Sequence, residues 1–517
     1  MNTLGHISKG TLVLCMLALS ACGGGGGGGT PQPPPPPDDP PPTGGITRTG
    51  NTISVGAISG FGSVIVNGLH FDTTAATFKV DGDDNASQSD LSVGDVVLVK
   101  GTIDDDNTNA VAVSVEFDDN VEGPITVNSI VFDPLDPAAG GTFMVLGQTV
   151  HVSLTTSFDD SISPATIEGL SDGDIVEVSG LPHGDGSVDA TRVEFKTLLP
   201  GELFEVTGIA SGPFTGSSFM INQLVVDTAT RSATFDNFPN GRDIAEGDPV
   251  EVKGEQTLGG ASGQELIAVR VEYKGDRLAG DDGDHVEIEG FITRFVDATD
   301  FDVTDIPVTT DPVTTEFEGG DAGDLGMNLK VEVEGEYDND ILVATKVQIK
   351  QAKVVRMVAL VDSVDPAPTD GSLPSLVMLD VTVEVDPDLT RFEDKISANR
   401  EESLNIGHIG MSDYVEVRGQ EIPPGSGILF AVILERDDPD TETIVRGFVE
   451  SESPLTVLGV QINTTPSTQF RDALGNSIAN LTDFLAAIDT NSVIKAKGTE
   501  DSGGNSITAE EIEIKNE

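Results

Sequence analysis

The sequence predicts an all-β protein, in which six tandem five-stranded barrels follow an apolar leader and a Gly/Pro-rich tether. Three observations predict this organisation. An apolar leader ends in a cysteine, a run of glycines and prolines follows it, and a strand pattern then recurs about every eighty residues. The last of these, alternation of apolar and polar residues with a period of two, is typical of half-buried strands.

Residues 1–21 are expected to form a lipoprotein signal peptide. Lys9 and the amino terminus supply positive charge, and the apolar run 11–19 that follows is too short for a membrane-spanning helix. The run closes on Leu19-Ser-Ala-Cys22, which resembles the lipobox of bacterial lipoproteins, where the signal peptidase cuts before a diacylated cysteine. We therefore expect Cys22 to carry a lipid that anchors the protein to a membrane.

The chain has two cysteines, Cys15 and Cys22. Cys15 lies in the segment expected to be removed and Cys22 would be lipidated, so the mature chain would keep no thiol. Disulfides, thiolate metal sites and cysteine catalysis are thereby excluded.

Residues 22–52 predict an extended tether. Seven glycines and a proline-rich run cannot bury apolar surface, so the segment acts as a spacer between the lipid and the folded part. In the lipoproteins that the signal resembles, an aspartate after the cysteine favours retention in the inner membrane. Gly23 stands there instead, which favours the outer membrane, on its periplasmic face or at the cell surface.

The strongly negative net charge of the chain limits which partners it is expected to bind. The chain has 28 Lys+Arg against 87 Asp+Glu, for a formal net charge of −59, and such a surface repels phosphate backbones. Nucleic acid is therefore not an expected partner. The chain has no tryptophan and 3 tyrosines, which weakens a glycan-binding interpretation without excluding it.

One segment occurs six times: a leucine or isoleucine, a short turn, an alternating strand, and a glycine that closes the strand. The closing glycines are Gly101, Gly180, Gly254, Gly335, Gly419 and Gly498. The turns contain Gly94-Asp95, Gly173-Asp174, Gly247-Asp248, Asn328, Asp413 and Asn491. Glycine and asparagine tolerate a positive φ, and aspartate accepts hydrogen bonds from nearby backbone, so each segment predicts a turn ahead of a strand.

Each of these strands has two apolar positions, two residues apart, with mostly charged neighbours. The apolar positions are Val97, Val99, Val176, Val178, Val250, Val252, Val331, Val333, Val415, Val417, Ile494 and Ala496. The charged neighbours include Glu177, Glu251, Glu332, Glu416 and Lys495. We expect the apolar side chains to point inward and the charged ones to point outward.

A second strand follows each closing glycine, with an alanine and then branched or aromatic residues at fixed offsets. The alanines are Ala112, Ala190, Ala268, Ala344, Ala431 and Ala509, and only Arg436 breaks the apolar pattern after them. An earlier half, clearest at residues 56–78, supplies the remaining strands. Five short antiparallel strands closed into a barrel can bury a core and hide their edges.

The repeats are numbered 1 to 6 and span residues 53–119, 120–198, 202–275, 284–351, 352–437 and 441–516. We expect each to fold as a separate barrel rather than as one rung of a solenoid, because the strands alternate within each copy. The pattern V-N-G, then L-x-x-G-D-x-V-x-V-x-G, then A-x-x-V-x-F resembles a family of uncharacterised repeat modules in bacterial lipoproteins. That resemblance implies OB-like barrels, and it supplies no catalytic or binding residues.

No catalytic residue is predicted. Gly169-Leu-Ser171-Asp-Gly173 matches a nucleophile elbow, but the match falls on the turn of the repeat. The mature histidines, His70, His151, His183, His285 and His408, show no metal-ligand spacing.

Acidic runs offer weak calcium ligands, with Asp81, Asp83, Asp104 and Asp106 as the candidates. Calcium takes six to eight oxygens, yet none of the runs has the spacing of an EF-hand. We interpret them as solvated turns, with weak calcium binding as the alternative, and expect no other cofactor.

These observations favour a non-enzymatic envelope protein that presents its barrels to a protein or glycan partner. Two alternatives remain open. One is an acid-pair hydrolase with its site between repeats, which facing carboxylates with shifted pKa values in a cleft would favour. The other is a calcium-dependent adhesive rod, which melting with and without a chelator tests.

Overall fold

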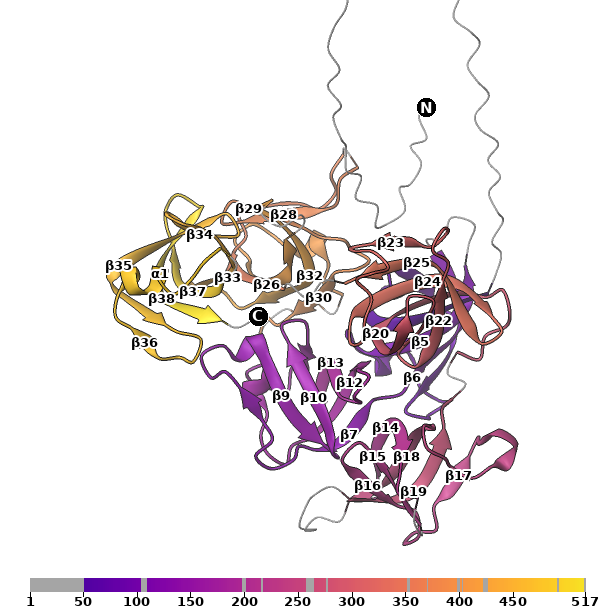
Figure 1. Ribbon diagram of the computed structural model, residues 1–517. Coiled ribbons are helices and arrows are strands. Elements are labelled where there is room, and N and C mark those ends of the chain that lie inside the picture. The colour runs from indigo at the N-terminus through magenta and orange to yellow at the C-terminus, as the bar shows by residue number, and fades with distance from the viewer. Residues whose placement is uncertain are drawn as a thin grey trace, which may run out of the picture.

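The computed structural model describes residues 51–103, 109–197, 201–214, 217–256, 265–275, 278–350, 354–369, 371–397, 400–401, 403–421, 426–490 and 492–515. Cys22, Asp104, Asp106 and Asn491 lie outside these ranges. Within them the chain forms 38 strands, five 3-10 helices and one α-helix, α1 (Leu481–Leu485), which confirms the predicted all-β class (Figure 1). No helix in the described part has the length and apolar character needed to cross a membrane.

The strands form three sheets, and each sheet joins two repeats. The sheet of repeats 1 and 4 contains β1 (Asn51–Gly60), β2 (Val64–Val66), β3 (Leu69–Asp72), β4 (Thr77–Val80), β5 (Val96–Ile103), β6 (Asn109–Phe117), β20 (His285–Asp297), β21 (Asp300–Val303), β22 (Ile306–Thr310), β23 (Glu316–Glu318), β24 (Lys330–Asp338) and β25 (Ile341–Ile349).

The sheet of repeats 2 and 3 contains β7 (Val121–Pro124), β8 (Val131–Phe132), β9 (Gly140–Val145), β10 (Gln148–Ser153), β11 (Ser157–Phe158), β12 (Ile175–Pro182), β13 (Val188–Phe195), β14 (Phe204–Ser211), β15 (Ser218–Ile221), β16 (Leu224–Asp227), β17 (Thr234–Asp236), β18 (Pro249–Gln256) and β19 (Glu265–Tyr273).

The sheet of repeats 5 and 6 contains β26 (Val355–Leu360), β27 (Ser363–Asp365), β28 (Ser375–Met378), β29 (Val381–Glu384), β30 (Arg391–Asp394), β31 (Tyr414–Glu421), β32 (Ile428–Asp437), β33 (Thr443–Glu452), β34 (Leu455–Val457), β35 (Val460–Arg471), β36 (Ser477–Ile478), β37 (Val493–Glu500) and β38 (Ser506–Lys515).

Strand pairing closes five-stranded barrels. In repeat 1, β1 pairs with both β2 and β5, and the ring runs β1-β2-β3-β6-β5. The ring of repeat 3 runs β14-β15-β16-β19-β18 in the same order. The ring of repeat 6 runs β33-β34-β35-β38-β37. In each ring, the third strand pairs in parallel with the strand that comes last in the chain, as β3 does with β6. The expectation of purely antiparallel strands is therefore wrong.

The predicted inward positions fill these barrels. All of them are buried, from Val97 and Val99, which are 1% and 0% exposed, to Ile494 and Ala496, both 0% exposed. The alternation therefore gave the correct strand register. Arg436, which breaks the apolar pattern, places its Nε 3.1 Å from a carboxylate oxygen of Asp394 on β30, so an ion pair replaces the apolar contact.

Each closing glycine lies at a β-bulge opposite the predicted alanine. The register shifts between Lys100 and Gly101, and Gly101 then faces Ala112. The corresponding pairs are Gly180–Ala190, Gly254–Ala268, Gly335–Ala344, Gly419–Ala431 and Gly498–Ala509. A Cβ on Gly101 would lie 2.4 Å from the carbonyl oxygen of Val111, so the two backbones can approach this closely only at glycine.

The turns ahead of these strands have the predicted chemistry. Positive φ values of 98°, 85°, 86° and 60° occur at Gly94, Gly173, Gly247 and Asn328. The Asp95 carboxylate accepts a hydrogen bond from the backbone N–H of Ser92 at 2.7 Å. Asp174, Asp248 and Asp413 accept the equivalent bond in their own turns.

The repeats are joined through their first strands. β7 pairs antiparallel with β14, and β26 with β33, but β1 of repeat 1 pairs parallel with β20 of repeat 4. β5 pairs along one edge of β1, and β2 reaches the other edge only at Ile58 and Gly60, so residues 52–55 can pair with β20 on that second edge. Strand pairing therefore continues from one repeat into another, in addition to the rings that close within repeats.

The charged face of the strands is buried at several points, contrary to expectation. Glu177, Glu251 and Lys495 are 6%, 3% and 8% exposed. Repeat 2 covers Lys495, whose ammonium donates to the carbonyl of Leu135 at 2.6 Å. In Figure 1, β9 and β10 of repeat 2 lie below the sheet of repeats 5 and 6. This contact between repeats 2 and 6 is thus polar.

Candidate functional site

A row of charged side chains crosses the sheet where repeats 2 and 3 share β7. Glu122 on β7 faces Glu177 of β12 on one side and Glu205 of β14 on the other. Lys253 of β18 stands opposite Glu205 and ends the run of acids. Like charges directly opposite each other destabilise a sheet, so three neighbouring carboxylates need compensation from outside the row.

Repeat 1 brings two more carboxylates to this row. Asp81 follows β4 with a φ of 49°, and its N–H donates to the carbonyl of Phe117 at 2.9 Å. Asp119 lies in the link between β6 and β7, and its backbone N–H donates to Asp81 Oδ1 at 3.4 Å. Asp119 is 1% exposed, and among the described residues neither of its carboxylate oxygens has a hydrogen-bond partner.

The carboxylate oxygens of these residues converge. One oxygen each from Asp81, Asp119 and Glu205 lie within 4.8 Å of one another, and so do oxygens from Asp119, Glu122 and Glu177. We call these five residues the junction cluster. Oxygens that bind one Ca²⁺ at about 2.3–2.6 Å lie at most about 5 Å apart. The junction cluster therefore has the spacing and the donor type of a site for a hard divalent cation.

Two lysines border the junction cluster. The Lys196 ammonium lies 2.5 Å from Glu177 and 3.2 Å from Glu194. Lys253 pairs with Glu205 and also donates to the backbone carbonyl of Asp81 at 2.8 Å. Both lysines are thus engaged with other groups, and neither gives a hydrogen bond to the Asp119 carboxylate.

Burial raises the pKa of each carboxyl in the junction cluster. The pKa of Asp119 rises well above its usual value because of burial and the nearby Glu205 and Glu177 carboxylates. Burial raises the pKa of Glu177 to about 8 although Lys196 opposes the shift. The pKa values of Glu205, Asp81 and Glu122 also rise, with burial as the main cause. Burial thus disfavours the ionised form of each of these carboxyls unless a positive charge lies nearby.

The calcium candidates predicted from the sequence lie in different surroundings in the structure. Asp81 belongs to the junction cluster. Asp83 is exposed and accepts hydrogen bonds from the backbone and side-chain N–H groups of Asn85 at 2.8 and 3.0 Å, which is the geometry of a solvated turn. Asp104, Asp106 and the lipidation site Cys22 lie outside the described residues. The cluster members that sequence reasoning missed are Asp119, Glu122, Glu177 and Glu205.

Ser171 lies in an exposed turn that leads into strand β12. Its backbone N–H donates to the Asp174 carboxylate at 2.7 Å, as in the turns of other repeats. A nucleophile elbow instead connects a strand to a helix, so this local geometry belongs to the repeat turn.

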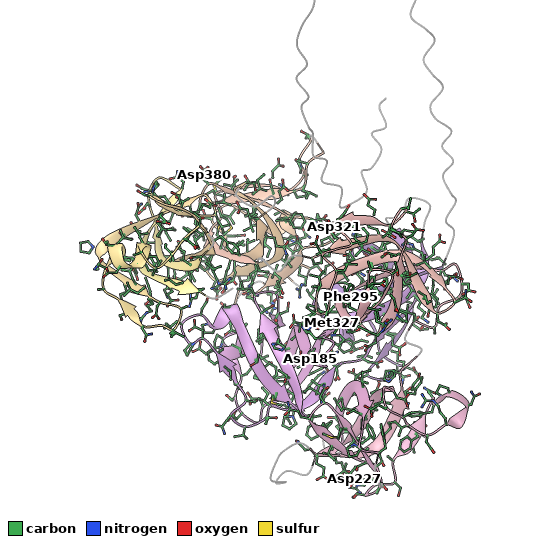
Figure 2. The ribbon with its side chains drawn as sticks, in the orientation of Figure 1. Asp185, Asp227, Phe295, Asp321, Met327 and Asp380 are labelled. Atoms are coloured by element: carbon green, nitrogen blue, oxygen red, sulfur yellow. The ribbon has the colours of Figure 1, made fainter. Side chains whose placement is uncertain are left out.

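Two of the histidines, His70 and His183, lie at contacts between repeats. The ring of His183 in repeat 2 stacks on Phe291 of repeat 4, with 3.9 Å between ring centroids, and its Nε2 lies 3.1 Å from Asp189. Figure 2 shows the same region, with Asp185 close to Met327 in the view. His70 of repeat 1 pairs with Asp388 of repeat 5. Such contacts position the repeats relative to one another.

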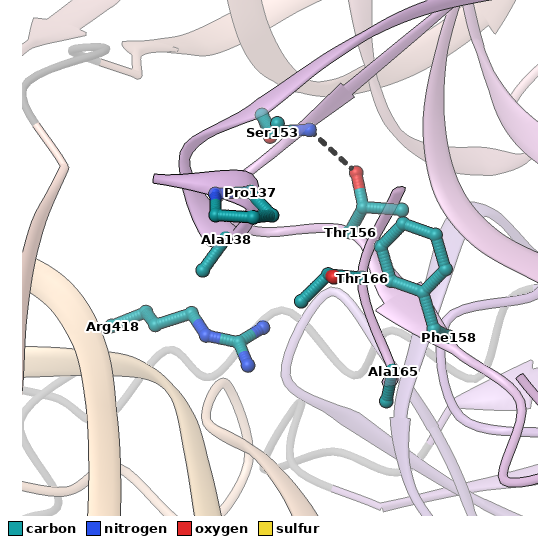
Figure 3. A pocket seen from close by; sticks show the side chains of 9 residues that line it. Pro137, Ala138, Ser153, Thr156, Phe158, Ala165, Thr166 and Arg418 are labelled. Atoms are coloured by element: carbon teal, nitrogen blue, oxygen red, sulfur yellow. Dashed lines mark hydrogen bonds between the residues drawn. The ribbon is translucent and has the colours of Figure 1, made fainter. Parts of the chain in front are cut away.

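A small cavity lies between repeats 2 and 5 (Figure 3). The Arg418 side chain of β31 points into it, toward Thr166 and Phe158. Its volume is about 10 Å³, room for about one water molecule. The guanidinium also donates to the carbonyl of Leu154 at 3.3 Å, so the cavity is part of the packing between repeats.

The sequence profile of a family described as "Domain of unknown function (DUF5666)" matches five segments of the chain, residues 54–116, 123–194, 205–272, 280–348 and 445–513. The segments coincide with repeats 1 to 4 and 6, which confirms the resemblance to uncharacterised repeat modules. No curated protein matches the chain.

Proposed function

The chain belongs to the DUF5666 family, whose function is unknown, and from that premise we propose that it is a non-enzymatic cell-envelope lipoprotein that binds a protein or glycan partner. Its lipid at Cys22 anchors it to the outer membrane, and residues 22–52 hold the folded part away from the bilayer. The folded part consists of six OB-like modules.

Repeat 5, residues 352–437, has no match to the family profile but is counted as a module because its structure repeats that of the matched segments. Gly419 faces Ala431 at a bulge, and Val415 and Val417 point into the core. The hydroxyl of Thr390 donates to the Ala431 carbonyl at 2.8 Å, as Thr468 does to Ala509 at 2.7 Å in repeat 6. These shared contacts support a common module.

The ring order supports an OB-like assignment. Counting only ring strands, β1, β2, β3, β5 and β6 close in the order first, second, third, fifth, fourth. The third and fifth strands run parallel, while the other neighbours are antiparallel. This is a five-stranded Greek-key barrel, the architecture of OB folds.

The observation that carries the binding proposal is that polar contacts hold the repeats as one body. Arg391 of repeat 5 is 8% exposed and donates to the carbonyls of Thr155 and Thr191 in repeat 2 at 2.7 and 3.2 Å. Lys515 of repeat 6 lies 2.7 Å from Asp133 of repeat 2. Loops fixed in this way lose little entropy when a partner binds, which favours affinity.

The acid-pair hydrolase alternative finds less support. The junction cluster does bring carboxylates from different repeats together with raised pKa values. However, Asp119 and Glu205 are only 1% and 4% exposed, so a substrate cannot reach them in this arrangement. A binding role for the surface loops is therefore the better supported function.

The exposed apolar side chains on three loops provide the test. Val313, Met411 and Leu474 are 88%, 72% and 85% exposed. A photo-cross-linking residue at each position, in cells that make the lipidated chain, should give a discrete adduct at one or more of them. The unmodified chain, irradiated in the same way, serves as the control. Adducts at none of the three loops, or the same adducts from the control, would contradict the proposal.

A further inference from the structure

Asp119 is the most unusual buried group in the junction cluster. Its carboxylate is 1% exposed and has no hydrogen-bond partner among the described residues, although oxygens of four other acids converge on it. An unpaired buried charge is costly, so the site needs a positive partner or a proton.

The side chains around the site do not supply that partner. Lys196 pairs with Glu177 and Glu194. Lys253 is engaged by Glu205 and the Asp81 carbonyl, and it lies 3.7 Å from Glu251. Among the described groups that border the cluster, five carboxylates thus meet two ammonium groups, an excess of three acids.

The third nearby lysine is also engaged. Lys274 of repeat 3 pairs with Asp118 at 2.7 Å and with Glu251 at 2.6 Å. It therefore ties repeat 1 to repeat 3 beside the cluster, and its ammonium is shared between these two carboxylates. Among the described residues, the groups that converge on the Asp119 carboxylate are therefore other carboxylate oxygens, and none of these three lysines donates to it.

We propose that Ca²⁺ binds at the junction cluster, with Asp81, Asp119 and Glu205 as its protein ligands. These three residues come from the turn after β4, the link between β6 and β7, and strand β14. The ion thus joins repeat 1 to repeat 3 and fixes the link to repeat 2. This goes beyond the proposed binding function, and its test needs no binding partner.

The donor set selects the ion. All donors are carboxylate oxygens, which hard cations prefer, whereas zinc sites are usually built with histidine or cysteine. Carboxylates from three separate elements form an irregular set, which suits Ca²⁺ better than Mg²⁺, because Mg²⁺ demands near-ideal octahedral geometry. Ca²⁺ takes six to eight oxygens, so water would complete the shell around these three carboxylates.

The experiment uses the full mature chain in non-ionic detergent, stripped of metal, with Ca²⁺ added during calorimetry at moderate ionic strength. We expect a stoichiometry of one for the tight site and a higher Tm with Ca²⁺ than with EDTA. Asp119→Asn should weaken the tight site about tenfold or more, because it removes a ligand charge. Asp83→Asn, in an exposed turn near Asp81, is the matched control and should bind as the unmodified chain does.

The Tm in EDTA separates loss of a ligand from failure to fold. Asp119→Asn removes an unpaired buried charge, so in EDTA its Tm should equal or exceed that of the unmodified chain. Ca²⁺ should then raise the Tm of the unmodified chain and of Asp83→Asn, but not that of Asp119→Asn. The proposal would be overturned if the titration curve or the Ca²⁺-dependent Tm were the same for Asp119→Asn and the unmodified chain. It would also be overturned if the unmodified chain bound no Ca²⁺ at this site, because protons alone would then neutralise the cluster.

Discussion

Glu122 on β7 stands directly opposite Glu177 on β12, with the carboxylates on the face of the sheet that the sequence marks as polar. Glu177 is nevertheless 6% exposed, because the link between repeats 1 and 2 and the turn after β4 cover this face. Period-two alternation shows that one face of a strand is apolar, but it does not show whether the other face meets water or a second repeat.

The inward face gives the most direct stability prediction. Val178 is 0% exposed in the core of repeats 2 and 3, so Val178→Asp buries an unpaired carboxylate and should cost roughly 3–5 kcal/mol of unfolding free energy. Urea unfolding of the mature chain measures this. Glu168→Ser, at an exposed position in the same repeat, should change stability by less than about 0.5 kcal/mol. Equal effects would show that the register is misassigned.

The bulge glycines predict a second stability effect. A Cβ on Gly335 would lie 2.2 Å from the carbonyl oxygen of Val343 in the facing strand, so Gly335→Ala should destabilise the protein by about 1–3 kcal/mol. Gly326→Ala in the same repeat is the control, because no atom lies within 4 Å of its Cβ position and its φ is not positive. Thermal melts of both variants should differ clearly; similar melts would mean that the bulge can open without cost.

Much of the fold could be predicted from the sequence because its signals are local. Gly94 and Asp95 specify a turn through their own backbone chemistry, and Val97 and Val99 define an inward face by their spacing. The partner of β1 could not be predicted, since parallel pairing with β20 depends on peptide groups, which every residue has.

The junction cluster was harder to predict for a related reason. Asp81 could be chosen from its acidic run, but Asp119 precedes a strand at a place where aspartate usually forms turns. Glu122 and Glu205 look like ordinary outward residues of alternating strands. Their convergence depends on how three repeats pack, and that information is not local in the sequence.

Raised carboxyl pKa values predict that stability in EDTA falls as pH rises. Burial raises the pKa of Glu177 from 4.5 to about 8, so the folded state holds a proton that the unfolded state has lost above about pH 4.5. The folded chain is therefore penalised progressively between about pH 5 and pH 8, and the penalty is complete above about 8. Burial likewise raises the pKa of Asp95 to about 7, against the attraction of Arg192, so its contribution has the same sign.

Thermal melts in EDTA at a series of pH values measure this dependence, and the Tm should be higher at pH 5.5 than at pH 8. Glu177→Gln should reduce the slope, because glutamine does not titrate and Lys196 keeps Glu194 as a partner. A Tm that rises between pH 5.5 and pH 8, or a slope that Glu177→Gln leaves unchanged, would contradict the assignment of raised pKa values to the junction.

The shared ladder between β7 and β14 predicts how the repeats depend on each other. Repeat 3 closes its own ring and has its own inward valines, Val250 and Val252, so residues 202–275 alone should fold with a sheet-type spectrum and a cooperative melt. In the whole chain, however, β14 also pairs with β7, and Val121 and Val206 belong to one apolar core that spans repeats 2 and 3.

Residues 120–275 should therefore melt in a single transition at a higher temperature than residues 202–275, as calorimetry can measure. Two transitions in the longer fragment, the lower one at the Tm of repeat 3 alone, would show that the ladder between repeats contributes nothing to stability. An unfolded short fragment beside a stable longer one would show instead that repeat 3 requires β7, because pairing between repeats then supplies what ring closure does not.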